Sequence, residues 1–179
     1  PAAWGMAFQY FFSYSQAWLM MLVVAIVGPP LIAQDVRSKA FLLYFSKPIV
    51  RLEYLLGKMG IVLFYIFIVT LFPALMLYGI SIAFSPSVSA FLQTSETVVR
   101  ILLASMVISI PATLVILFLS SLTKDSRFAT FGWITFWGLG EVSYGLLSNL
   151  PGMKNSEWVF LLSIRETTSV ITAKIFDVA

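Results

Sequence analysis

The sequence predicts an all-α, polytopic helical membrane protein with four membrane-spanning helices. Apolar residues make up 60% of the chain and charged residues 11%, whereas a soluble domain is about half apolar and about a quarter charged. Apolar stretches long enough to cross a hydrocarbon core of about 30 Å alternate with short polar segments. Five of the eleven cations gather in one loop, residues 31–58, between the first two apolar stretches.

The charges of this loop predict how the chain is oriented. Its cations outnumber its two acids, Asp35 and Glu53, and they are Arg37, Lys39, Lys47, Arg51 and Lys58. Because cationic loops stay on the cytoplasmic side, we expect the loop to face the cytoplasm from the inner (plasma) membrane. The net charge of +3 and the pI near 9.3 are explained by this loop, and they predict no nucleic-acid partner.

Several chemistries are excluded by residue types that the sequence lacks. It contains no cysteine and no histidine, which removes thiolate chemistry, imidazole bases and the commonest zinc ligands. The predicted spans carry no paired carboxylates, serine–lysine dyad or metal-ligand cluster. No G-x-x-x-x-G-K-[ST] loop is present, so the chain cannot hydrolyse ATP by itself. We predict that it is not an enzyme and holds no cofactor or metal.

The first two segments are 1–16 and 17–34. Residues 1–16 are rich in aromatic side chains and carry no charged side chain, which predicts an interfacial segment at the lipid headgroups. The alternative, that they form the end of a spanning helix, stays open. Residues 17–34 are the first predicted span, and Gly28, Pro29 and Pro30 are expected to kink or loosen its last turns.

Residues 35–58 form the predicted cytoplasmic region. Within it, residues 36–45 are expected to form a short amphipathic helix along the membrane surface. Ser46 is a plausible N-cap for the following helix, with Pro48 in the first turn, where a missing N–H costs nothing.

Three further spans follow, at 59–80, 98–121 and 128–148. Pro73 predicts a kink near Val69 in the second span, and the third contains Pro111. The fourth span has several glycines that let helices approach closely, namely Gly132, Gly138, Gly140 and Gly145. Residues 149–179 contain no apolar run of about eighteen residues, so we expect them to stay outside the cytoplasm without spanning.

Four spans with this orientation leave both ends outside the cytoplasm. One additional span before Pro1 and one after Ala179 would give six spans with both ends inside. We therefore expect the natural chain to be longer at both ends.

One run of residues carries a family resemblance. The run GPPLIAQDVRSKAFLLYFSKPIVRLEYLLGK, residues 28–58, contains an I-A-x-D-x-R step, a segment ending in S-x-P, and then R-x-E-Y and L-L-G-K. This pattern resembles the type-2 ABC transporter permease family, in particular permeases grouped with multi-copper enzyme maturation systems. The rest of the chain matches that family in hydropathy alone.

The resemblance implies a six-helix permease subunit of an ATP-driven exporter. It implies a second permease chain, identical or homologous, and a separate cytoplasmic ATPase that holds ATP and Mg. The spans visible here would be the family's second to fifth, and residues 36–45 would be the coupling helix that docks the ATPase. The residues predicted to contact the ATPase are Asp35, Arg37, Ser38, Lys39, Phe41 and Leu42.

Two simpler hypotheses stay open beside this one. The basic surface helix could anchor to anionic membrane lipids, at about 1 kcal/mol for each Lys or Arg near the surface. The chain could also be a non-transporting membrane anchor or scaffold within a larger complex, which would hold a soluble partner without coupling to nucleotide.

Glu141 stands out because it lies inside the predicted fourth span with no basic residue beside it. A charge at the bilayer centre costs about 2.5–3.5 kcal/mol on insertion scales, so we expect Glu141 to face the bundle or a cavity, or to be protonated. Tyr144, three residues on, shares its helix face. The pair is predicted either to line the substrate path or the interface between permeases, or to form a structural hydrogen bond between helices.

Overall fold

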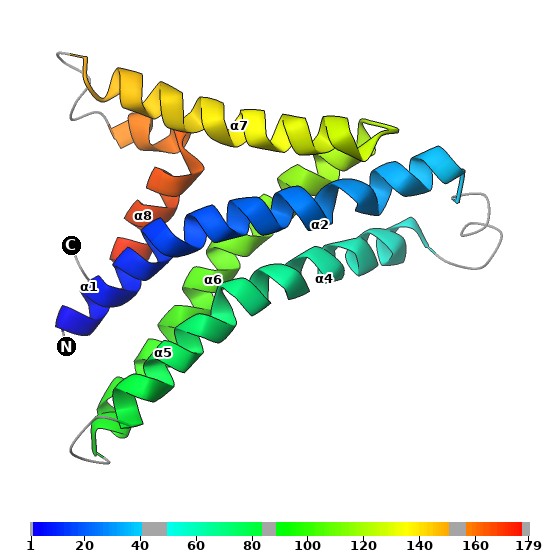
Figure 1. Cartoon of the computed structure of the whole chain (residues 1–179). Coiled ribbons are helices and arrows are strands. Elements are labelled where there is room, and N and C mark those ends of the chain that lie inside the picture. Colours follow the sequence, from blue (N-terminus) through cyan, green and yellow to red (C-terminus); the bar gives the residue numbers. More distant parts are fainter. Residues whose placement is uncertain (1, 41–49, 84–88, 151–156, 177–179) are drawn as a thin grey trace.

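The computed structural model describes residues 2–40, 50–83, 89–150 and 157–176, and every element that these residues form is a helix (Figure 1). The predicted all-α class is therefore confirmed. The elements are α1 (Ala2–Tyr10), the π-helical turn η1 (Phe11–Gln16), α2 (Ala17–Ser38), α4 (Arg51–Val69), α5 (Leu71–Ala83), α6 (Ser89–Ser121), α7 (Ser126–Leu147), the 3₁₀ turn η2 (Glu157–Leu162) and α8 (Ile164–Ile175).

The first long helix is continuous from α1 through η1 into α2. The backbone stays in the right-handed helical region at both junctions, with φ −60° and ψ −43° at Tyr10 and φ −58° and ψ −44° at Ala17. Phe8 and Phe12 are buried and lie 5.6 Å and 6.1 Å, between ring centroids, from Phe176 after α8. Residues 2–16 therefore extend the helix of the predicted span 17–34, and the same helix runs past residue 34 to Ser38.

The helix α2 continues through Pro29 and Pro30. A proline at position 29 leaves the carbonyl of Ala25 without its usual helical donor, and the hydroxyl of Thr130 in α7 donates to that carbonyl at 3.2 Å. Gly28 lets α6 come close, because a Cβ atom there would lie 2.3 Å from Cγ1 of Ile116. Neighbouring helices thus support α2 at the position where its own hydrogen bonding is weakened.

The predicted kink near Val69 lies one residue later, at Thr70, where α4 ends and α5 begins in a new direction (Figure 1). Thr70 has φ −99° and ψ −58°, and its hydroxyl donates to the carbonyl of Ile66 at 2.9 Å. Pro111, by contrast, lies inside α6, which stays continuous.

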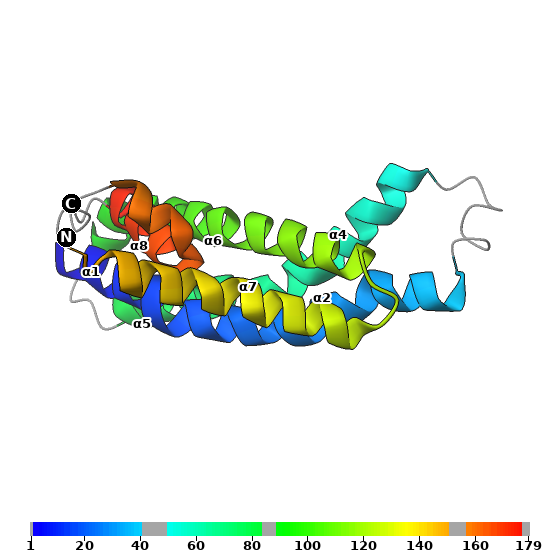
Figure 2. The same cartoon turned by 90° about the horizontal axis from the view of Figure 1, so that it is seen from above.

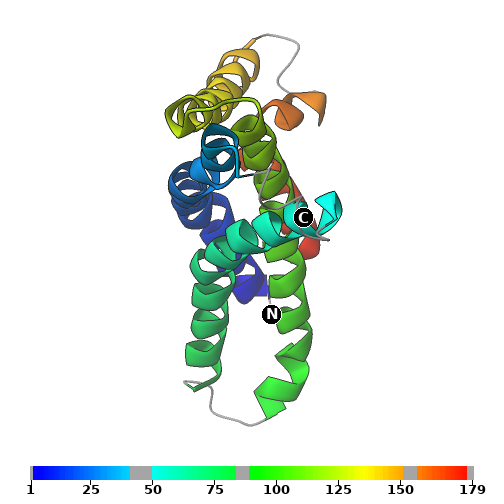
Figure 3. The same ribbon diagram turned by 90° about the vertical axis from the view of Figure 1, so that its right-hand side faces the viewer.

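The helices pack in layers. The pair α2 and α6 lies between α7 on one side and α4 with α5 on the other (Figures 1 and 3). The short helix α8 packs against η1, η2 and α6 near the beginning of the chain (Figure 2). Between the layers, the ring of Trp133 is fully buried, and its indole N–H donates to the carbonyl of Met21 at 3.0 Å.

Three helical stretches are long and apolar enough to cross a membrane, namely Met6–Ser38, Arg51–Ala83 and Glu96–Ser121. They contain the whole of the predicted spans 17–34, 59–80 and 98–121. The helix α7, predicted as a fourth span, has 22 residues but is not among the three. Its glycines, its tryptophans and Glu141 lower its hydropathy, so its place in the membrane stays a prediction.

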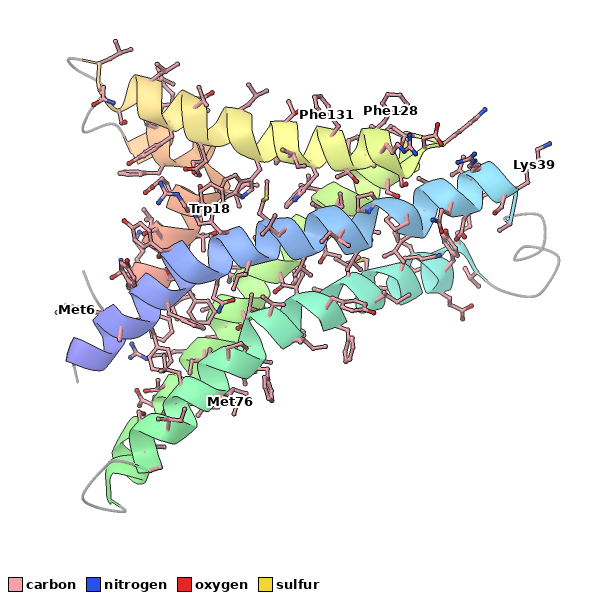
Figure 4. The ribbon with its side chains drawn as sticks, in the orientation of Figure 1. Met6, Trp18, Lys39, Met76, Phe128 and Phe131 are labelled. Carbon is pink, nitrogen blue, oxygen red and sulfur yellow. The ribbon has the colours of Figure 1, made fainter. Side chains whose placement is uncertain are left out.

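Large apolar side chains also cover the outside of the bundle. Phe128 and Phe131 of α7 are 69% and 72% exposed and point away from the other helices (Figure 4). Met76 of α5 is likewise exposed. A surface of this kind is suited to contact with lipid chains or with another membrane helix.

Candidate partner-binding site at the cationic end

One end of the bundle carries the excess of cations. The end of α2, the start of α4 and the turn between α6 and α7 meet there, at the right of Figure 1. We call this the cationic end, and among the described residues it comprises six basic side chains against three acidic ones: Arg37, Lys39, Arg51, Lys58, Lys124 and Arg127 against Asp35, Glu53 and Asp125. This is the end that the positive-inside tendency favours in the cytoplasm.

A partly buried network joins α2 to α4 at this end. The ammonium of Lys58 lies 2.7 Å from a carboxylate oxygen of Asp35, and the hydroxyl of Tyr54 donates to the same oxygen at 2.7 Å. The Lys58 ammonium is also 5.4 Å from the centroid of the Tyr54 ring. Because the Asp35 and Lys58 side chains are only 14% and 17% exposed, we call this cluster of three residues the α2–α4 brace. The Asp35 carboxylate thus makes its contacts within the brace, and its predicted role as a partner contact stays a prediction.

Arg37 and Lys39 are two of the exposed cations of this end, and they lie at the end of α2. The Arg37 guanidinium lies 3.0 Å from a carboxylate oxygen of Asp125, yet the two side chains are 73% and 51% exposed. Such a surface pair contributes about 0–1 kcal/mol to stability. Lys39 is exposed at the tip of the helix (Figure 4), and its left-handed backbone, with φ 55°, ends α2. Ser38 is exposed too, and its hydroxyl donates to the carbonyl of Gln34 at 2.8 Å.

The helix predicted at 36–45 differs at its beginning. Residues 36–38 form the last turn of α2, because the helix does not end at the two prolines and stops only at Lys39. The predicted start at Val36 is therefore wrong, whereas the amphipathic helix itself stays a prediction. Phe41 and Leu42, predicted as partner contacts, lie outside the described residues.

The start of α4 also corrects a prediction. The N-cap is Val50, with φ −75° and ψ 145°, so the helix begins later than a cap at Ser46 implies; Ser46 and Pro48 themselves lie outside the described residues. The carboxylate of Glu53 accepts the backbone N–H of Val50 at 3.1 Å. An acidic side chain in the first turn also interacts favourably with the positive end of the helix dipole.

A second polar cluster lies toward the other end of the bundle, around Glu141. The Nε of Arg165 in α8 lies 2.9 Å from one carboxylate oxygen of Glu141, and the hydroxyl of Ser163 donates to the other. The Glu141 and Arg165 side chains are 21% and 18% exposed. Glu141 lacks a basic neighbour in sequence, but the fold brings one from 24 residues away.

Arg165 is held from several sides. Its guanidinium also pairs with Glu166 and lies 5.5 Å from the centroid of the Tyr14 ring. Burial lowers the pKa of Arg165, but the hydrogen bond and negative charge of Glu141 outweigh that effect, and the pKa is raised above its ordinary value. Tyr144 contributes a ring contact, 5.9 Å between centroids, with Phe160 of η2. The contacts of Glu141 and Tyr144 therefore fit the hypothesis of a structural connection, here from α7 to η2 and α8.

The fold and the three long apolar helices define this chain as a helical membrane protein. Comparison with protein-family models, with curated proteins and with solved structures finds no match. Within the described residues, no group of acidic side chains is arranged to hold a metal ion. The exposed cations of the cationic end are suited to contact with anionic groups.

The α2–α4 brace yields a direct prediction. Replacing Lys58 by methionine keeps an unbranched side chain but leaves the partly buried Asp35 carboxylate without its cation, so the free energy of unfolding should fall by about 2 kcal/mol. Arg51→Met is the control, because Arg51 is an exposed cation in the first turn of the same helix. Titration of the purified protein with a denaturing detergent measures both variants, and equal stability of the two would contradict a brace.

Proposed function

We propose that the chain is a transmembrane permease subunit of an ATP-driven ABC exporter in the plasma membrane. In this proposal α7 is a fourth span and the cationic end faces the cytoplasm. A separate ATPase docks on that end and supplies ATP and Mg, and a second permease chain, identical or homologous, completes the transporter. The observation that carries the proposal is a pair of exposed cations, Arg37 and Lys39, at the end of a helix whose last turns are held by the α2–α4 brace.

The residues of the family resemblance support this proposal by their places in space. Asp35, Tyr54 and Lys58 come from the two halves of the resembling run and form the α2–α4 brace. Arg37, from the first half, contacts the turn between α6 and α7. Because several residues of this run hold the end of α2 in place, that end is suited to docking a partner that exerts force on it.

The brace also suggests how a partner's movement would reach the spans. A push on Arg37 and Lys39 acts on the last turn of α2. Because Asp35 is tied to Lys58 and Tyr54, α4 would move with that turn. Interactions that join rigid helices transmit displacement without requiring any chemistry in the permease itself.

The test is co-purification with charge-reversal variants of the full-length chain. The double variant Arg37→Glu with Lys39→Glu should lower the amount of co-purifying ATPase at least about tenfold, since two favourable charge contacts become repulsive. Lys174→Glu is the control, because Lys174 is an exposed cation of α8, away from the cationic end. A copurifying protein with a P-loop, lost only in the double variant, is the expected result.

Two outcomes would overturn the proposal. One is a labelling experiment that places a cysteine introduced at Lys39 on the outer face of the membrane. The other is a partner at fixed stoichiometry that lacks nucleotide-binding motifs, which would favour the anchor or scaffold alternative. Retention of the partner by the double variant would instead remove Arg37 and Lys39 from the docking surface.

A further inference from the structure

A single hydroxyl of α6 binds the backbone of α2 at three points. Ser120 is completely buried. Its Oγ accepts the N–H of Ile32 at 3.2 Å and the N–H of Ala33 at 3.0 Å, and it donates to the carbonyl of Pro29 at 2.7 Å. A side chain with one donor and two acceptor positions is thereby fully used on one turn of another helix.

That turn is the weakest part of α2. Pro29 and Pro30 have no backbone N–H, so two of the helical hydrogen bonds to residues 25 and 26 cannot form. Gly28 precedes them and has no side chain to pack. Bending a helix costs least where such bonds are missing, so the direction of the segment beyond the prolines depends on contacts with other helices.

The segment beyond the prolines is the one that carries the candidate site. We call residues 31–38 the arm of α2; it includes Asp35 of the brace and Arg37, and Lys39 follows it. The arm meets the α6 side of the bundle twice, at Ser120 near its base and at Asp125 near its tip. The brace ties the same arm to α4, and of the two contacts on the α6 side only the one with Ser120 is buried, so Ser120 should contribute more than Asp125 to the direction of the arm relative to α6.

We infer that Ser120 is a positioning residue that fixes the direction of the arm of α2 relative to α6. The arm follows α6 because the Ser120 hydroxyl bridges the turn that the prolines weaken. Where the proposed function holds, Ser120 also sets where Arg37 and Lys39 meet the ATPase, and that second consequence rests on the proposed function. The first consequence concerns the fold alone.

The test compares two adjacent serines in the full-length chain, reconstituted in lipid nanodiscs. Ser120→Ala removes all three contacts with α2. Ser121→Ala is the matched control, because the Ser121 hydroxyl donates only within α6, to the carbonyl of Phe118 at 2.7 Å, and is exposed. Amide hydrogen exchange is measured along residues 31–39. We expect exchange about tenfold faster throughout the arm in Ser120→Ala, and no change in Ser121→Ala.

The inference is tested by which amides of residues 31–39 exchange faster. Faster exchange only at Ile32 and Ala33, with the rest of the arm unchanged, would mean two local hydrogen bonds and would overturn the positioning role. Unchanged exchange throughout would overturn it as well. If Ser120→Ala does not accumulate, Ser120→Cys replaces it, since a thiol of similar size is a weaker donor and acceptor. Exchange in the arm of Ser120→Cys should then be faster than in the parent chain, and equal exchange would overturn the role.

A second measurement on the same preparations separates this inference from the proposed function. With the ATPase bound, Ser120→Ala should retain the partner but show less ATP hydrolysis per bound partner, because the docking cations are held less firmly. Faster arm exchange with no ATPase in the parent preparation would uphold Ser120 as a positioning residue and reject the exporter. Co-purifying ATPase with unchanged exchange in the arm would support the exporter and would overturn the positioning role of Ser120.

Discussion

Replacing Arg165 by methionine is expected to lower the free energy of unfolding by about 3 kcal/mol, because removal of one partner leaves the partly buried carboxylate of Glu141 uncompensated. Arg165 lies between Glu141 and Glu166, so its loss also sets two negative charges against each other. The connection between α7 and α8 depends on this cation, and detergent-induced unfolding of the purified protein measures the change.

Two further variants make that result specific. Lys174→Met removes an exposed cation from the last turn of the same helix and should change stability by less than about 0.5 kcal/mol. The double variant Glu141→Gln with Arg165→Met should recover part of the loss, since the neutral amide needs no cation. If Arg165→Met is as stable as Lys174→Met, the ion pair does not hold α8 in place.

The sequence predicts best the helices whose apolar residues form one continuous local run. The spans 59–80 and 98–121 are continuous apolar runs between polar turns, and Pro73 marks the bend at Thr70. Residues 2–16 are different, because serine and glutamine interrupt their apolar pattern. Ser13 is nevertheless buried, with its hydroxyl 3.5 Å from that of Thr172 in α8. A polar residue buried by a contact 159 positions away leaves no local signal.

In the candidate site, too, some residues could be predicted from the local sequence and others could not. Arg37 and Lys39 could be predicted as exposed cations from the local charge pattern alone. The roles of Tyr54 and Lys58 were missed, although their spacing of four residues places them on one helix face. Nothing local says that this face meets Asp35, because that contact depends on how α2 and α4 pack. Arg165 was missed as the partner of Glu141 for the same reason, because the packing of α8 against α7 is a tertiary feature.

Replacing Gly140 by alanine is expected to destabilise the protein by about 2 kcal/mol, although alanine is the better helix former by about 1 kcal/mol. A Cβ atom at Gly140 would lie 2.6 Å from the carbonyl oxygen of Leu162 and 3.5 Å from the Cα of Ser163. These are backbone atoms, so η2 must move away from α7. Ser163 would move with η2 and would be drawn away from its hydrogen bond to Glu141.

Gly138→Ala, two residues earlier on the same helix, is the matched control. A Cβ atom there has nothing within 4 Å, so the variant should gain up to about 1 kcal/mol from helix propensity alone. Detergent-induced unfolding should therefore separate the two alanine variants by about 3 kcal/mol. Equal stability would mean that η2 does not press against α7 in the membrane. Only one of the four glycines predicted to allow close approach meets backbone this tightly, because packing depends on which residue faces the neighbouring segment as well as on residue size.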